Sequence, residues 1–112
     1  MRSPSLDRRE FARRAMTIKV VEEHVGGRSE AEALDIGVLG MRYVKPASAP
    51  RCTGHEVMLE FRLPGDEAPV QVMGWIAGEE VCRDRRFLSV TFAFPTDEDS
   101  ARLRRLLGRA SA

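Results

Sequence analysis

The sequence predicts an all-β protein, an antiparallel β-barrel of about six strands closed by a C-terminal α-helix. Three observations favour this fold. Apolar and polar residues alternate over residues 55–63 and 87–94, with the period of a strand that buries one face. Turn-forming glycines and prolines separate the apolar segments at fairly even spacing. The final segment, residues 96–109, instead repeats its apolar side chains with the period of a helix.

Length and composition describe a single globular domain. The chain has 112 residues, of which 43% are hydrophobic and 31% are charged. Its net charge of +1 argues against a general binder of nucleic-acid polymers or membranes, which needs a broad basic surface. We expect a flexible basic arm over residues 1–14 and the barrel with its helix over residues 15–112. No secretory leader or membrane-spanning segment is apparent, so a cytoplasmic location with reduced cysteines is expected.

The strands can be placed in order from these patterns. They are expected over residues 15–21, 33–44, 55–63, 69–77 and 87–94, where 33–44 forms two strands or one bent strand. A proline and a glycine at positions 64 and 65 make a hairpin of the two segments that flank them. Residues 25–29 are expected to form a turn or loop, and residues 78–86 a charged connection.

The helix is expected over about residues 96–109. Thr96 begins it and acidic residues 97–99 follow, an arrangement typical of a helix N-terminus. The apolar stripe consists of Ala101, Leu103, Leu106, Leu107 and Ala110. We expect this stripe to pack against the barrel or a second subunit. The solvent-exposed face is expected to carry Arg102, Arg104, Arg105 and Arg109.

A single carboxylate interrupts the apolar run of residues 34–43. Burying Asp35 in a strand is costly, so its presence there needs an explanation. Gly37 and Gly40 follow it, and glycine allows a positive φ angle or the close approach of another group. Two interpretations remain open from these residues alone. The segment is either a turn in which Asp35 binds the local backbone, or one side of a ligand site.

The basic arm is the second unusual segment. Residues 1–14 contain five arginines against two acidic residues, although the whole chain is nearly neutral. Arg9 and Arg13 are four residues apart and share one face in either a helix or a strand. Phe11 lies between them and is expected to anchor the segment on the barrel. The arm is either a local site for an anion or a solvated terminal segment.

Together the two segments resemble the PilZ family, small β-barrel receptors for cyclic di-GMP. That family carries R-x-x-x-R, followed after one strand and a loop by [D/N]-x-S-x-x-G. Arg9–Arg13 matches the first motif in full. Asp35–Gly40 matches the second with one departure, Gly37 in place of serine. The order of strands and turns from Arg8 to about Arg105 is also similar to that family.

The resemblance implies a site for cyclic di-GMP made by Arg8, Arg9, Arg13, Asp35, Gly37 and Gly40. Arginine suits this ligand because its planar guanidinium binds phosphate with two hydrogen bonds, pairs with guanine and stacks on a base. Asp35 would accept hydrogen bonds from the guanine edge, and Arg14 is a supporting candidate. The missing serine hydroxyl would cost about 0.5–1.5 kcal/mol, which weakens binding without abolishing it.

The implied function is that of a bacterial second-messenger receptor with no cofactor besides its ligand. In the family, the basic segment wraps over the bound ligand and the rearranged surface engages an effector protein. Regulation of motility or biofilm formation is the expected output, by a monomer or a homodimer. The alternative is a PilZ-like interaction module that does not bind cyclic di-GMP.

Other functional classes find little support in the sequence. No nucleophile is accompanied by an apt base, and paired carboxylates and glycine-rich phosphate loops are absent, so we do not expect an enzyme. Cys52 and His55 have ligand-like spacing, with His24 and Cys82 as conceivable completions, but one close pair does not predict a metal site. A barrel that binds nucleic acid would need exposed aromatic residues. Tyr43 and Trp75 are the outward candidates, and Trp75 is expected to cap the barrel or pack on the helix.

Overall fold

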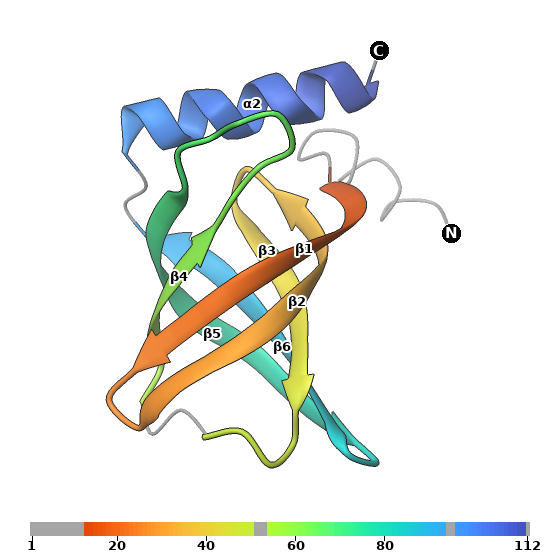
Figure 1. Cartoon of the computed structure of the whole chain (residues 1–112), viewed down its shortest axis with the longest axis vertical. Helices are drawn as coiled ribbons and strands as arrows, with labels where there is room; N and C mark the ends of the chain where they lie inside the picture. The colour runs from red at the N-terminus through yellow and green to blue at the C-terminus, as the bar shows by residue number, and fades with distance from the viewer. Residues whose placement is uncertain (1–12, 51–53, 94–95, 112) are drawn as a thin grey trace.

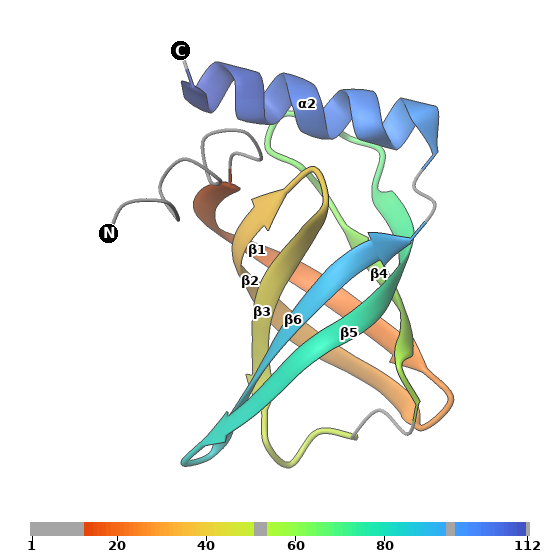
Figure 2. The same ribbon diagram turned by 180° about the vertical axis from the view of Figure 1, so that it is seen from behind.

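The computed structural model describes residues 13–50, 54–93 and 96–111, and it describes the side chains over residues 17–50, 54–93 and 96–105. Six antiparallel strands close into a barrel, and a helix lies across one end of it (Figure 1, and from behind in Figure 2). The elements are β1 Arg13–His24, β2 Gly27–Gly37, β3 Gly40–Pro46, β4 Glu56–Phe61, β5 Val70–Cys82, β6 Arg85–Ala93 and α2 Asp97–Ser111. The predicted fold class is confirmed.

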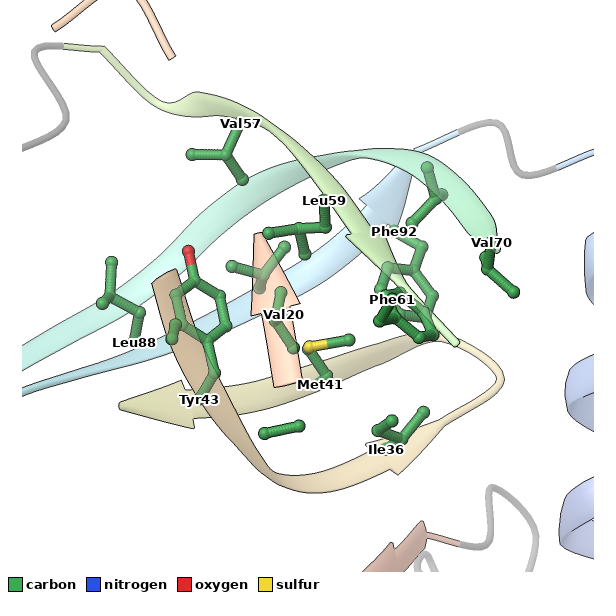
Figure 3. Close-up of a cluster of buried hydrophobic side chains, with 14 of the residues drawn as sticks. Val20, Ile36, Met41, Tyr43, Val57, Leu59, Phe61, Val70, Leu88 and Phe92 are labelled. Atoms are coloured by element: carbon green, nitrogen blue, oxygen red, sulfur yellow. The ribbon is translucent and has the colours of Figure 1, made fainter. Parts of the chain in front are cut away.

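The strands follow the order β1-β2-β3-β6-β5-β4 around the barrel, and β4 pairs with β1 to close it. Alternate residues of each strand face the interior, as the sequence pattern predicts. In β4, for example, Val57, Leu59 and Phe61 are buried, and the ring of Phe61 stacks on Phe92 at a centroid distance of 6.3 Å. Figure 3 shows these side chains meeting in one core. Each fully buried aliphatic or aromatic side chain contributes about 1.5–3 kcal/mol.

The first hairpin is tighter than the sequence predicts. β1 begins two residues earlier than expected, and β2 begins at Gly27, so the turn over residues 25–29 shrinks to two residues. The inward positions of the early part of β2 are Ser29, Ala31 and Ala33, which are buried. Small residues at these positions produce a weak apolar alternation, which explains why this part of the strand was not predicted.

The prediction of a charged connection over residues 78–86 is wrong. β5 continues to Cys82, and β6 begins after a two-residue turn in which Arg83 has a φ angle of 61°. We call residues 77–86 the β5–β6 ribbon. Residues 77–85 are exposed on both faces, so the ribbon lacks the alternation that reveals a half-buried strand. An ion pair between Arg86 and Glu79 links its two strands.

Helix α2 is fixed to the barrel by a buried arginine. Leu103 is 1% exposed and joins the core, but the prediction that Arg102 lies on the solvent-exposed face is wrong. The Nε of Arg102 donates to Asp66 Oδ2 at 3.0 Å, and its Nη atoms donate to the carbonyl oxygens of Ala68 and Pro69. The guanidinium fork therefore satisfies backbone acceptors of the β4–β5 loop that face the helix. At the start of the helix, Thr96 Oγ1 accepts a hydrogen bond from Asp99 N, as predicted.

A polar cluster lies inside the barrel at the end opposite α2. Lys45 Nζ donates to Glu22 Oε1 at 2.5 Å and to the carbonyl oxygen of Pro50 at 2.8 Å. Tyr43 donates its hydroxyl to Glu22 Oε2, and His24 Nε2 lies 3.4 Å from Glu22 Oε1. The expectation that Tyr43 faces outward is therefore wrong. Its ring lies in the core, and its hydroxyl can be buried there because the carboxylate of Glu22 accepts a hydrogen bond from it.

Candidate functional site

Arg13, the last residue of the first sequence motif, lies beside the second motif at one end of the β1–β2 ladder. Arg13 is the partner of Gly37 in the antiparallel register, and Ala15 is the partner of Asp35. Partner Cα atoms in such a pair are about 4.5–5.5 Å apart, so the last residue of the first motif lies beside the third residue of the second motif. Arg8 and Arg9 lie outside the described residues, and for Arg13 and Arg14 the backbone is described. The arginine clamp therefore stays a prediction.

A β-bulge determines where Asp35 lies. Between Ala33 and Asp35 the register of β2 against β3 shifts, so Leu34 and Asp35 together oppose Arg42. The Asp35 side chain is 20% exposed, and its Oδ2 lies 3.8 Å from Arg42 Nη1. Asp35 is therefore held at the outer surface of the barrel. The alternative of an aspartate that serves a local turn is not favoured, because Asp35 lies within a paired strand.

The two glycines have different surroundings. A Cβ atom at Gly40 would lie 2.1 Å from the backbone oxygen of Val90, so this position requires glycine because β6 passes so closely. Glycine at position 40 could leave space either for a ligand or for the reversed backbone. In the structure the backbone of β6 occupies this space. Gly37 is buried at the end of β2. Among the described residues, positive φ angles occur at Gly27, Gly65 and Arg83, so Gly37 does not need one.

Two further residues belong to this outer surface and were not predicted as site residues. Arg42 has a side chain that is 47% exposed, beside Asp35. Trp75 is 42% exposed on the outer face of β5, so it does not cap the barrel. The register places Gly40, Thr91 and Trp75 in one row across β3, β6 and β5. Neighbouring strands are about 4.8 Å apart, so the Cα atoms of Trp75 and Gly40 are about 10 Å apart.

Comparison with known proteins depends on structure, since no protein-family model matches the chain and no curated protein matches it. The PilZ domain of YcgR from Escherichia coli, solved with c-di-GMP, matches 91% of this chain and 90% of its own with a TM-score of 0.71 and 13% identity. The chain has a PilZ-like fold. The Bacillus subtilis inhibitor of motility MotI/DgrA matches 93% of this chain with a TM-score of 0.79 and 16% identity. This chain spans about half the length of MotI/DgrA, 51%.

The outer surface of this PilZ-like barrel combines a carboxylate, a guanidinium and an exposed indole. Such a surface suits a ligand with planar bases and anionic groups. An indole can stack on a base, a guanidinium can bind an anionic group, and a carboxylate can accept hydrogen bonds from a base edge. Within the residues that the structure describes, no three histidine, cysteine, aspartate or glutamate side chains come together as metal ligands would. In the same residues no helix has the length and apolar character needed to cross a membrane.

Proposed function

We propose that this chain binds cyclic di-GMP and passes the signal to a protein partner. The observation that carries the proposal is the register of β1 against β2, in which Arg13 lies opposite Gly37. Arg13, the last residue of the R-x-x-x-R segment, precedes Asp35 by 22 residues in sequence, yet it pairs with Gly37 of the D-x-G-x-x-G segment. The likeness to a PilZ domain solved with c-di-GMP adds support at the level of fold.

Each side chain has a chemical role in this proposal. Arg9 and Arg13 bind the phosphates and stack on a base, with Arg8 in support. Asp35 accepts hydrogen bonds from guanine N1–H and its exocyclic amino group, which present two donors to two carboxylate oxygens. Arg42 holds Asp35 at 3.8 Å before ligand binds. Since exposed ion pairs contribute at most about 1 kcal/mol, the carboxylate can exchange this contact for guanine.

Calorimetric titration of the purified chain tests the proposal. We expect saturable heat with cyclic di-GMP, and much weaker binding of GTP and cyclic di-AMP. Cyclic di-AMP keeps the two phosphates but lacks the guanine N1–H and amino donors, so its loss of affinity measures recognition by the carboxylate. Equal affinity for the two cyclic dinucleotides would contradict the role of Asp35. The absence of binding by cyclic di-GMP would contradict the proposed ligand.

Gly37→Ser should strengthen the binding of cyclic di-GMP several-fold. The added hydroxyl can donate or accept a hydrogen bond worth about 0.5–1.5 kcal/mol, and the backbone at Gly37 does not need a positive φ angle. Gly37→Ala is the matched control, because it adds a Cβ without the hydroxyl. Titration of both variants separates the two effects. Serine binding no more tightly than alanine would show that the hydroxyl has no partner in the complex.

The glycine at position 37 also favours a second candidate function, a PilZ-like module that acts through protein contacts without the ligand. In that case Asp35 and Arg42 would serve the surface of β2 and β3 instead of a nucleotide. The two functions differ in one result. If neither the wild-type chain nor Gly37→Ser binds cyclic di-GMP, the interaction module is the function that remains.

A further inference from the structure

Arg42 is an arginine that the fold positions without using its hydrogen-bond donors. Its neighbours Met41 and Tyr43 are 0% exposed and point into the core (Figure 3), so alternation along β3 turns Arg42 outward. Its side chain is 47% exposed. Within the described part of the chain, its guanidinium has the ion pair with Asp35 at 3.8 Å and donates no hydrogen bond. By contrast, the buried Arg102 donates to two carboxylates and two carbonyl oxygens.

The β-bulge of β2 sets the carboxylate of Asp35 beside this guanidinium. Ala33 and Ile36 are both 0% exposed and face the core, so the two residues between them lie on the outer side of the strand. Asp35 is the partner of Arg42 in the register of β2 against β3. Directly opposite residues have Cβ atoms about 4.5–5.5 Å apart. The backbones of the two strands therefore hold one acceptor group and one donor group side by side on the outer face of the barrel.

These two groups match different atoms of one guanine. Guanine presents two donors, N1–H and the exocyclic amino group, beside the acceptor O6, and a second acceptor lies at N7. A carboxylate can accept from both donors, and a guanidinium can donate to O6 and N7. At 3.8 Å, Asp35 Oδ2 and Arg42 Nη1 are close enough to face neighbouring groups of a single base.

Adenine fits the same pair poorly, and each of the two side chains meets a different mismatch. Adenine carries an amino donor where guanine has O6, so the donors of Arg42 would face another donor. Its N1 carries no proton, so the carboxylate of Asp35 would face an acceptor. Polar groups left unpaired in this way lower affinity more than a missing apolar contact does. The loss of one side chain would therefore leave the discrimination by the other in place.

We propose that Arg42 is a specificity-determining residue, which donates to O6 of the guanine whose N1–H and amino group bind Asp35. This role rests on the proposed binding of cyclic di-GMP and adds a second reader of the base to it. Before ligand binds, the ion pair keeps both side chains over the outer face of β2 and β3. When guanine binds, the two groups exchange a 3.8 Å contact, which is longer than a hydrogen bond, for hydrogen bonds to the base.

Arg42→Ala tests this role by its effect on selectivity. The variant should bind cyclic di-GMP about tenfold or more weakly, since it loses a charged hydrogen bond. Its affinity for cyclic di-AMP, measured by displacement of fluorescent cyclic di-GMP, should stay the same or rise, because adenine has no acceptor at the position of O6. Cyclic di-IMP has a base that keeps O6 and N1–H but lacks the amino group. Its affinity should fall by the same factor as that of cyclic di-GMP.

Two further variants complete the experiment. Arg42→Lys keeps a charged donor without the planar fork, so it should recover part of the affinity and part of the preference for guanine. Arg28→Ala removes an exposed arginine of β2, seven residues before Asp35, and should leave all three affinities unchanged. A thermal melt of each variant checks the fold, which Arg42→Ala should preserve because Arg42 is exposed.

Three results would overturn the role of Arg42. An unchanged or higher affinity of Arg42→Ala for cyclic di-GMP would mean that Arg42 does not bind the base. Equal losses for cyclic di-GMP and cyclic di-AMP would assign it to a phosphate instead. A smaller loss for cyclic di-IMP than for cyclic di-GMP would mean that it acts by positioning Asp35, which binds the amino group. Failure of the proposed function is a separate result, in which the wild-type chain itself does not bind cyclic di-GMP and the role of Arg42 falls with it.

Discussion

Lys45→Met should lower the free energy of unfolding by about 3–5 kcal/mol, because it leaves a carboxylate buried without its cation. Glu22 is 0% exposed, and Lys45 Nζ lies 2.5 Å from its Oε1. Methionine fills most of the lysine volume, so the loss would report on charge and hydrogen bonding more than on packing. The hydroxyl of Tyr43 would remain on the other carboxylate oxygen. Urea unfolding followed by circular dichroism measures the change.

Two variants control this measurement. Lys19→Met removes an exposed lysine from the same sheet and should change the free energy by no more than about 0.5 kcal/mol. Glu22→Gln combined with Lys45→Met should recover about 1–3 kcal/mol of the loss, since it removes the uncompensated charge. A loss below about 1 kcal/mol in Lys45→Met would contradict the account, as would a double variant less stable than the single one.

Arg9→Ala and Arg13→Ala should each weaken the binding of cyclic di-GMP ten- to a hundredfold. Each replacement removes a charged hydrogen bond worth about 1.5–3 kcal/mol. Asp35→Ala should weaken binding comparably and reduce the preference for guanine over adenine. The melting temperature of the two arginine variants should barely change, because Arg9 belongs to the basic terminal segment and Arg13 forms the last pair at the end of the β1–β2 ladder. Calorimetric titration beside a thermal melt gives both quantities.

Arg28→Ala is the matched control for the arginine variants. Arg28 is exposed on β2, nine residues before Gly37, which places it about 30 Å from the candidate site. It removes the same charge and should leave the affinity within about twofold at physiological salt, where such distances are screened. An equal loss in Arg28→Ala and Arg13→Ala would mean that the arginines act through net charge instead of a specific clamp.

The barrel could be predicted because most of its strands bury one face. The alternation in β4 and β6 is clean, and the structure places Val57, Leu59, Leu88 and Val90 in the core as expected. The β5–β6 ribbon could not be predicted in this way, because residues exposed on both faces carry no periodic signal. The sequence also could not place Arg102 or Tyr43, since their burial depends on acceptors from distant segments, Asp66 and Glu22.

The candidate site was predicted from motifs, and the structure adds the geometry that motifs do not contain. The sequence identified Asp35 and Gly37, but the bulge that sets Asp35 opposite Arg42 has no signature in a single strand. Arg42 itself lies outside both motifs. Its position two residues after Gly40 on the outward face of β3 is the signal that would have revealed it. Trp75 was singled out as an aromatic residue, but its place in the row with Gly40 depends on the strand order.

The closing of the barrel has a consequence for how the chain folds. β3 pairs with β6, whose residues follow about 40–50 positions later in the chain, and β1 pairs with the similarly distant β4. The first three strands can form a local meander, but both of its outer edges remain open until the later strands arrive. Such non-local pairing makes folding slow, on the order of milliseconds to seconds. During synthesis the first three strands are therefore complete while their outer edges are still unpaired, and these edges can then pair with other chains.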